Sequence, residues 1–384
     1  MEAYFDNSAT TIVTEDVKDI VVKVMTEDYG NPSSMHMVGV NAEKYLKEAK
    51  ETISKILKVE PNEIYFTSGG TESNNWAIMG AVEANKRSGK KIITTKVEHA
   101  SVKSPMKHLE QLGYEVTYLP VDQAGVVQID ALKEAMTEDT VLVSIMYVNN
   151  EVGAIQPIEE IGKYIKTINK NVIYHVDAIQ AFGKMEIKPK KSNIDVLTVS
   201  GHKIHGPKGT GFMYLKKNAK VNPFILGGGQ QNAMRSGTEN VPGIAGLAKA
   251  SDNCYKHLEE NVSTMIALKD YLIDGLLNID GVTVNSRKGN EGAPHIVSAS
   301  FSGVRSEVLL HALEDKGVYI SAGSACSSNK PAISETLKAM NIDKDLLGST
   351  VRFSFSRFNT KEEIDYTLEQ LKAMLPILRK YVRR

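Results

Sequence analysis

Short apolar runs alternate with longer amphipathic stretches between residues 64 and 215, and this alternation restricts the fold more than any other feature. Each run has the length and the β-branched or aromatic content of a strand, and the stretches between them suit helices. Parallel strands need such crossovers, so we predict an α/β fold whose mostly parallel sheet carries helices on both faces. The predicted strands are 64–67, 91–95, 115–119, 141–148, 172–176, 195–199 and 211–215, the last one antiparallel or at an edge.

A second, smaller unit is predicted after a long helix over residues 244–277. Its strands look antiparallel, which is typical of an α+β domain. Because 384 residues suit two domains, we predict a large domain over 16–258 and a small domain formed by 1–15 together with 259–384. The strands expected in the small domain are 282–284, 296–300 and 351–355, with helices over 306–316 and 362–379.

The charge balance and the cysteine content argue against several classes of function. Lys+Arg and Asp+Glu are equal at 46 each, so we expect neither nucleic acid nor a membrane as a direct partner. No apolar run reaches the length of a membrane span and no basic-then-apolar leader follows Met1, so we expect a soluble cytoplasmic protein. Cys254 and Cys326 are the only cysteines, too few for a disulfide framework, and no Cys/His cluster predicts a metal site.

Polar side chains recur where the predicted strands end. The carboxyl ends of parallel strands meet at one edge of a sheet, and open α/β sheets bind their ligands at that edge. We therefore predict one shared site. The side chains expected to meet there are Thr71, His99, Asn150, Asp177 and Lys203.

Lys203 follows the apolar run 196–199 and lies in the glycine-rich segment SGHKIHGPKG (200–209). A strand that opens into such a loop holds a side chain rigidly, as a lysine that forms a Schiff base requires. Ser200 and His202 lie beside Lys203 and are suitable donors to a phosphate. The alternative interpretation is a surface lysine in a turn.

A second glycine turn, Gly69-Gly70-Thr71, lies between the strand 64–67 and a helix that runs through Trp76 and Ala84. Free backbone N–H groups and the positive end of the helix dipole make such a junction a suitable anion site. Glycine turns before helices are also common without a ligand, and the GxxxxGK[ST] motif of a P-loop is absent.

If Lys203 holds pyridoxal phosphate, three other residues acquire roles. Asp177 suits the pyridine nitrogen, because a carboxylate there keeps the ring protonated as an electron sink. Gln180 can hydrogen-bond the phenolic oxygen, and His99 offers a flat ring for stacking and a titratable nitrogen for proton transfer. Without Lys203, Asp177 is interpreted as a helix N-cap and His99 as a structural residue.

Eight motifs, in family order over nearly the whole chain, resemble the class V aminotransferase group of pyridoxal-phosphate enzymes, and within it the NifS/IscS-type cysteine desulfurases. The resemblance implies the type I aminotransferase fold and pyridoxal 5'-phosphate as cofactor. The motifs are GGTESNN (69–75), EHAS (98–101), VNNEVG (148–153), HVDAIQ (175–180), SGHKIHGPKG (200–209), RSGTEN (235–240), SAGSACSS (321–328) and VRFSFSRFNT (351–360).

The resemblance also implies roles for individual residues. Gly70, Thr71, Ser200 and His202 are then phosphate-binding residues, joined by Thr238 from the other subunit of a homodimer. Asn150 contacts cofactor or substrate. Arg352 binds the α-carboxylate of the substrate, for which a bidentate guanidinium is well suited.

Cys326 alone would be interpreted as a small buried thiol in a turn. By resemblance it is the catalytic thiol, on a loop over about 321–335, that takes sulfur from L-cysteine as a persulfide, with release of L-alanine. Lys203 and His99 complete the implied catalytic set. Cys254 is interpreted as a packing residue. The sulfur then passes to an acceptor protein, a scaffold for iron–sulfur clusters or a tRNA-thiolation enzyme.

Two other functions stay open from the sequence. A selenocysteine lyase or another class V enzyme can share Lys203, Asp177 and His99, and Cys326 is the residue that distinguishes them. A catalytically silent sulfur-relay scaffold could retain the fold, because a fold does not prove a function. Loss of Lys203 or Cys326 would have favoured that interpretation, and both are present.

Overall fold

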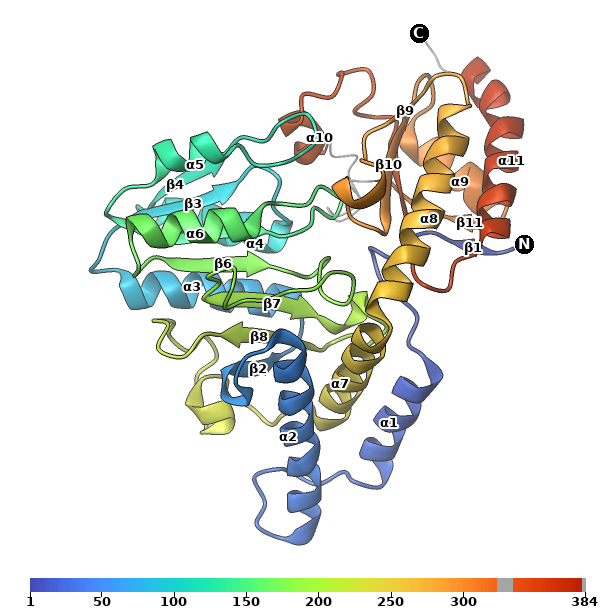
Figure 1. Ribbon diagram of the computed structural model, residues 1–384. Coiled ribbons are helices and arrows are strands. Elements are labelled where there is room, and N and C mark those ends of the chain that lie inside the picture. The colour runs from blue at the N-terminus through green and yellow to red at the C-terminus, as the bar shows by residue number, and fades with distance from the viewer. Residues whose placement is uncertain (323–333, 382–384) are drawn as a thin grey trace.

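The computed structural model describes residues 1–322 and 334–381, and a seven-stranded sheet forms its larger part (Figure 1). The strand order is β2-β8-β7-β6-β5-β3-β4. All pairs from β7 to β4 are parallel, so the predicted mostly parallel sheet is confirmed. β8 is antiparallel to both its neighbours and lies inside the sheet, with β2 at the edge. The bounds are β2 (Ile64–Thr67), β3 (Lys91–Thr95), β4 (Glu115–Leu119), β5 (Thr140–Met146), β6 (Ile173–Asp177), β7 (Val196–Ser200) and β8 (Gly211–Leu215).

Helices cover both faces of this sheet, because successive strand residues point to opposite sides. On β5, Leu142 lies in the apolar cluster of Trp76 and Met106, which come from α3 and α4. The next residue, Val143, lies in the cluster of Ile161 from α6. The predicted coverage of both faces is therefore confirmed. The helices are α3 (Gly70–Asn85), α4 (Ala100–Gln111), α5 (Ile129–Ala135) and α6 (Ile158–Ile168).

Two helices near the N-terminus, α1 (Glu15–Thr26) and α2 (Met37–Leu57), pack against α7 (Val241–Lys256). The sequence interpretation missed α1. The prediction of one continuous helix over 244–277 is wrong. The chain forms two helices, α7 and α8 (Leu258–Leu277), separated by His257, where the backbone leaves the helical region (φ −123°, ψ 31°). Neither glycine nor proline marks this break. Within the described residues, no helix has the length and apolar character needed to cross a membrane.

α8 leads to the smaller part of the molecule, which has its own apolar core around Phe5, Leu272, Phe301, Phe353 and Leu371 (Figure 1). Its sheet has the order β12-β13-β10-β9 with antiparallel pairing, as predicted for the strands 282–284, 296–300 and 351–355. The elements are β9 (Val282–Val284), β10 (Ile296–Phe301), α9 (Ser306–Glu314), β12 (Ser321–Ala322), α10 (Glu335–Ala339), β13 (Thr350–Ser354) and α11 (Lys361–Leu378).

The N-terminal arm, the segment before α1, joins the smaller part of the molecule. β1 (Ala3–Tyr4) pairs in parallel with β11 (Val318–Tyr319), and Asp6 forms a bridge with Ser354. The predicted division after residue 258 coincides with the start of α8, and the domain boundaries stay a prediction. The arm then continues across the carboxyl edge of the large sheet, where the candidate site lies.

Candidate active site

A cavity of about 290 Å³ lies at the carboxyl edge of the large sheet. Its walls come from the ends of β5, β6 and β7, the start of α3, the N-cap of α4, the N-terminal arm and β13. The five side chains predicted to meet at one edge all line it. The predicted site residues in its wall are Gly70, Thr71, His99, Asn150, Asp177, Gln180, Ser200, His202, Lys203 and Arg352.

Two predicted site residues are not placed in this wall. Thr238 is exposed on the segment before α7 and is absent from the residues that line the cavity. Cys326 lies outside the described residues. Cys254 is buried in the apolar cluster that packs on the seven-stranded sheet, and its thiol donates to the Ile204 carbonyl over 3.6 Å, in agreement with the packing role predicted for it.

Lys203 is held from both its side chain and its backbone. It ends a short 3-10 turn (Gly201–Lys203) directly after β7, and its Nζ donates to the carbonyls of Ser8 and Ala9, each over 2.6 Å. The buried Lys184 donates through Nζ to the Lys203 carbonyl over 2.9 Å. Burial lowers the pKa of Lys184 to about 8. Lys203 is therefore rigidly placed, as the sequence predicts.

The turn between β2 and α3 depends on two glycines. Gly69 has a φ of +145°, which only glycine adopts readily. A Cβ on Gly211 of β8 would lie 2.7 Å from the Gly69 Cα and 2.6 Å from the Val199 carbonyl, so this close approach also needs glycine. No side chain caps the N-terminus of α3 at Gly69. The turn leaves the first N–H groups of the helix available to an anion.

A second hollow, of about 440 Å³, shares part of this wall and extends along the glycine turn. Thr71, Ser200 and His202 line both cavities, and Lys208 lines the second. Burial, followed by the nearby Lys203 charge, lowers the pKa of His202 to about 4. A neutral His202 can donate a hydrogen bond to a phosphate through one ring nitrogen.

Asp177 ends β6 and is almost fully buried. Its Oδ2 accepts from Asn74 Nδ2 over 2.7 Å and its Oδ1 accepts from the Ile179 backbone N–H over 3.0 Å. Burial raises the pKa of Asp177, and these hydrogen bonds oppose that shift. No α-helix begins after β6 until α7, so the helix N-cap interpretation of Asp177 is wrong.

His99 is the N-cap residue of α4 and faces the same cavity as Asp177. Its Nδ1 lies 3.2 Å from the Ser101 backbone nitrogen, which donates to it, and 2.8 Å from Ser101 Oγ. Burial is the main cause that lowers the pKa of His99. The ring is therefore both a structural cap and a part of the cavity wall, and its role in stacking and proton transfer stays a prediction.

Arg352 reaches the cavity from β13 of the smaller sheet. Its Nη2 donates to Asp6 Oδ1 and its Nη1 donates to the Asn150 carbonyl, both over 2.8 Å. Its Nε is buried and has no hydrogen-bond partner among the described residues. Gln180 donates to the Ser8 carbonyl over 3.0 Å. The arm and the two sheets thus meet at this cavity.

The sequence interpretation missed several residues that build the site. Asn74 and Ser101 hold Asp177 and His99, and both occur inside motifs that had been singled out for other members. Ser8 and Ala9 hold Lys203 from the N-terminal arm, for which the sequence analysis predicts no role in the site. Asn74 and Ser101 are visible in the sequence as members of motifs, but the sequence does not show which side chains they contact.

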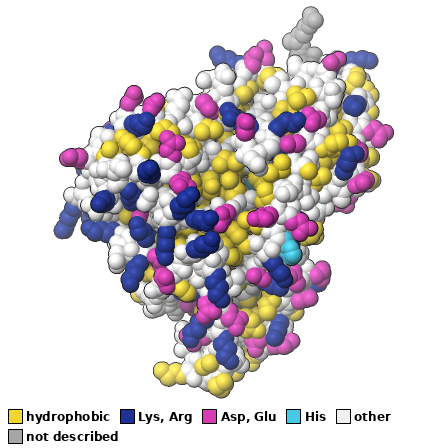
Figure 2. Space-filling view, viewed as in Figure 1, with side chains coloured by type: hydrophobic (Ala, Val, Ile, Leu, Met, Phe, Trp, Pro, Cys, Tyr) yellow, Lys and Arg dark blue, Asp and Glu magenta, His cyan; other side chains and the backbone are white. Residues whose placement is uncertain are grey.

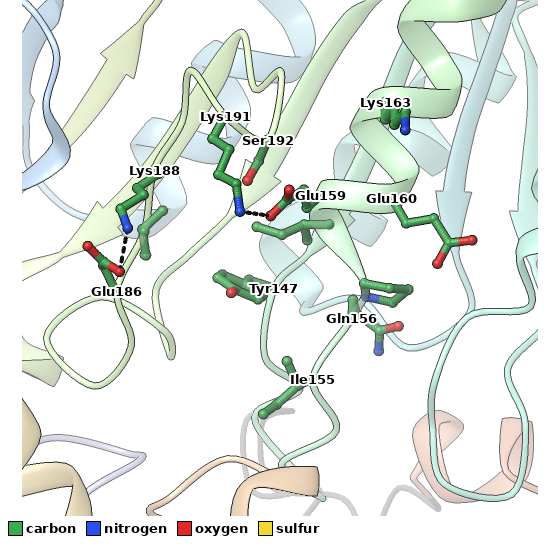
Figure 3. A pocket seen from close by; sticks show the side chains of 13 residues that line it. Tyr147, Ile155, Gln156, Glu159, Glu160, Lys163, Glu186, Lys188, Lys191 and Ser192 are labelled. Carbon is green, nitrogen blue, oxygen red and sulfur yellow. Dashed lines mark hydrogen bonds and ion pairs between the residues drawn. The ribbon is translucent and has the colours of Figure 1, made fainter.

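A larger hollow, of about 610 Å³, lies between α6 and the segment 186–192 (Figure 3). Four of its charged side chains form two pairs: Lys191 contacts Glu159 over 2.9 Å and Lys188 contacts Glu186 over 2.7 Å. None of the predicted site residues that the structure describes lines it. Size alone therefore does not identify the site, whereas the set of side chains at the sheet edge does.

Glu98 precedes His99 in the sequence, and the raised pKa of its buried carboxyl group can be tested. It is fully buried, its Oε1 accepts from Thr95 Oγ1 and the Met146 N–H over 2.8 and 2.9 Å, and burial raises its pKa to about 8 from an ordinary 4.5. An acid whose pKa is raised by folding stabilises the fold at low pH, and this contribution is lost as the pH rises from 4.5 towards 8.

We therefore expect Glu98→Gln to flatten the fall in stability between pH 5 and pH 8. Glutamine keeps the accepting oxygen and cannot ionise. Each pKa unit corresponds to about 1.4 kcal/mol, so the difference between the two pH values should shrink by a few kcal/mol at most. Chemical denaturation at both pH values measures it, and an unchanged pH dependence would contradict the assignment.

Comparisons with known proteins agree with this geometry. The family model "Aminotransferase class-V" matches residues 3–367. The cysteine desulfurase IscS of Methanosarcina thermophila is 44% identical over 98% of this chain and 92% of its own length. This chain belongs to the aminotransferase class-V family. Within the family it groups with the IscS and NifS proteins, which confirms the resemblance seen in the motifs.

Solved structures of class-V proteins have the same fold. A NifS-like protein is 39% identical, with a TM-score of 0.93 over 98% of this chain and all of its own. A structure described as SspA in complex with cysteine is 31% identical, with a TM-score of 0.81 over 93% of this chain and all of its own. The predicted type I aminotransferase fold is confirmed.

Pyridoxal 5'-phosphate is the cofactor of the class-V family, and the residues present fit it. A lysine amine, a buried carboxylate and an imidazole line one cavity. The glycine turn and the uncapped end of α3 form a cradle suited to a phosphate. Among the described residues no cluster of three or more His, Cys, Asp or Glu side chains offers an alternative metal site.

Proposed function

We propose that this protein is a cysteine desulfurase that converts L-cysteine to L-alanine and passes the sulfur to a cysteine of its own. One observation carries the proposal: Lys203, Asp177, His99 and Arg352 line a single cavity in a class-V chain whose relatives include the cysteine desulfurase IscS. The cavity contains a cofactor anchor and a carboxylate receptor together, as an amino-acid substrate requires.

Each residue proposed to hold pyridoxal phosphate would meet a different part of the cofactor. Lys203 Nζ would hold the aldehyde end, Asp177 would keep the ring nitrogen protonated, and the His99 ring would stack on the face. Gln180 would bond the phenolic oxygen. When bound, the cofactor acts as a sink for the electron pair released at the substrate α-carbon. The phosphate ligands are Gly70, Thr71, Ser200 and His202, with Thr238 from a second subunit.

The residues proposed to act on the substrate approach from the other sheet and from the arm. Arg352 binds the α-carboxylate, and Asn150 contacts cofactor or substrate. Lys203 Nζ removes the α-proton and later returns a proton to the α-carbon, and His99 gives or takes a proton at the substrate thiol. The Cys326 thiolate forms a bond to the substrate sulfur while the carbon–sulfur bond breaks. The electron pair of the broken bond stays with the substrate β-carbon, which takes up a proton, so that Cys326 carries the persulfide and alanine leaves.

Arg352→Lys should raise the KM for L-cysteine by about 10- to 100-fold, with a smaller change in kcat. Lysine keeps the charge but lacks the planar fork that binds a carboxylate through two bonds, and a charge-assisted hydrogen bond contributes about 1.5–3 kcal/mol. Steady-state kinetics measure the effect. Arg357→Lys is the matched control, because Arg357 does not line the cavity and donates to the Asn253 carbonyl. Equal KM values for wild type and Arg352→Lys would contradict the role.

The experiment that tests the proposal is incubation of the purified holoenzyme with L-cysteine and a reductant. We expect alanine and sulfide in equal amounts, because each turnover removes one sulfur from one cysteine. Selenocysteine serves as the competing substrate. Turnover of selenocysteine alone would assign a lyase of that specificity, and no turnover of either would leave the sulfur-relay scaffold. Either result would overturn the proposal.

A homodimer, a sulfur-acceptor protein and a cytoplasmic location complete the proposed function. The dimer is supported by exposed apolar side chains near α1, α2 and the segment before α7, some of which are visible at the lower end of Figure 2. Thr238 is exposed on that same segment. Sedimentation velocity tests the dimer. The apolar residues are Met25, Tyr29, Met35, Met37, Phe224 and Leu226.

A further inference from the structure

Asn74, on α3, is fully buried beneath the cavity, and its amide makes three hydrogen bonds. Its Nδ2 donates to Asp177 Oδ2 over 2.7 Å and to Ser101 Oγ over 2.8 Å. Its Oδ1 accepts from Thr198 Oγ1 over 2.6 Å. Asn74 thus connects the carboxylate proposed for the cofactor nitrogen with the serine that contacts His99.

The direction of each bond follows from the Asp177 carboxylate, which accepts hydrogen bonds. The Asn74 nitrogen must therefore face Asp177, and its second N–H points to Ser101 Oγ. The Ser101 hydroxyl is then left to donate to its remaining partner, His99 Nδ1, 2.8 Å away. The Ser101 backbone N–H donates to the same nitrogen over 3.2 Å.

We propose that Asn74 is a positioning residue that directs the Ser101 hydroxyl towards His99 Nδ1 and thereby places the ring proton of His99 on Nε2. This inference rests on the proposed role of His99 beside the cofactor and is independent of the identity of the substrate. In this arrangement His99 Nδ1 accepts a hydrogen bond before any substrate binds, and the ring has an N–H donor at Nε2.

The far side of the network is consistent with the same orientation. The Thr198 hydroxyl gives its hydrogen to Asn74 Oδ1, so it can only accept from His175 Nε2, 3.3 Å away. His175 Nδ1 then accepts from Ser144 Oγ over 2.8 Å. Burial lowers the pKa of His175 to about 3, which keeps this ring neutral. Apart from the proposed His99 Nε2–H, every donor in this network has an acceptor, as expected for buried polar groups.

The test is the variant Asn74→Asp, studied as the holoenzyme with ¹⁵N-labelled histidine. A carboxylate has no N–H for Ser101 and accepts the Ser101 hydroxyl instead, so that hydroxyl no longer donates to His99. We expect the wild-type spectrum to show a protonated Nε2 and an unprotonated Nδ1 for His99, and the variant to show a proton on Nδ1. His99→Gln identifies the signal among nine histidines.

The kinetic expectation for Asn74→Asp is a fall in kcat/KM of about 10- to 100-fold, the range typical of groups that orient a directly acting residue. Asn85→Asp is the matched control. Asn85 is also a buried amide on α3, but it bonds only the carbonyls of Ala81 and Lys220. It should leave the His99 signal unchanged even if it lowers stability.

Two results would overturn the inference: a proton on Nδ1 in the wild-type protein, or an Nδ1 that stays unprotonated in Asn74→Asp. A proton on Nδ1 in the wild-type spectrum overturns the inference even if the variant does not fold. The spectrum does not depend on turnover of L-cysteine. A failure of the proposed function would therefore appear in the alanine and sulfide assay and not here.

Discussion

Replacing Cys326 with serine should lower sulfide production from L-cysteine by at least about 10³-fold while the visible absorption of bound pyridoxal phosphate stays unchanged. A serine hydroxyl is not ionised near neutral pH and cannot carry a persulfide, so the step that removes the sulfur is lost. The cofactor contacts proposed for Lys203 and Asp177 do not involve this thiol. Assays of sulfide and alanine, together with the absorption spectrum, measure both parts.

Cys254→Ser is the matched control for that change, because Cys254 is buried in the apolar cluster that packs on the seven-stranded sheet. It should reduce stability modestly and leave the persulfide chemistry in place. Detection of the persulfide by mass spectrometry separates the two thiols. Full activity of Cys326→Ser, or loss of the persulfide only in Cys254→Ser, would refute the assignment.

Replacing Lys203 with alanine should also reduce turnover by at least about 10³-fold, and it should remove the covalent attachment of the cofactor as well. The phosphate cradle of the glycine turn is left intact, so the variant should still bind pyridoxal phosphate, but reversibly. Gel filtration followed by measurement of the retained cofactor distinguishes covalent from reversible binding.

Lys249→Ala is a suitable control for Lys203→Ala. Lys249 lies on α7, where it pairs with Asp16 over 3.4 Å, and it does not line the cavity. We expect this variant to keep both the cofactor and the activity. If Lys203→Ala retained the cofactor through gel filtration and denaturation as the wild type does, another amine would be the anchor.

The sheet and the convergence of five side chains at its edge could be predicted because both depend on local patterns. Strand and helix periodicities are short, and a polar residue after an apolar run is visible without its neighbours. The same reasoning missed α1, and it failed at His257, where α7 gives way to α8 without a glycine or a proline. Because no local sequence signal marks that break, helix propensity alone could not predict it.

The connections within the site could not be predicted, because their members are far apart in the sequence. Asn74 and Asp177 are separated by 103 residues, and Asp6 and Arg352 by 346. No periodicity relates such pairs, and only the folded backbone determines that their side chains meet. The proposed roles of Asn74 and of the arm therefore rest on distances, whereas those proposed for Lys203 and Asp177 rest on their positions after predicted strands and on the family resemblance.

Reduction of the holoenzyme with borohydride, followed by digestion and peptide mass spectrometry, tests the central claim most directly. The account predicts pyridoxal phosphate fixed to the peptide that contains Lys203. Attachment to Lys184 or Lys208, or to no lysine at all, would contradict it.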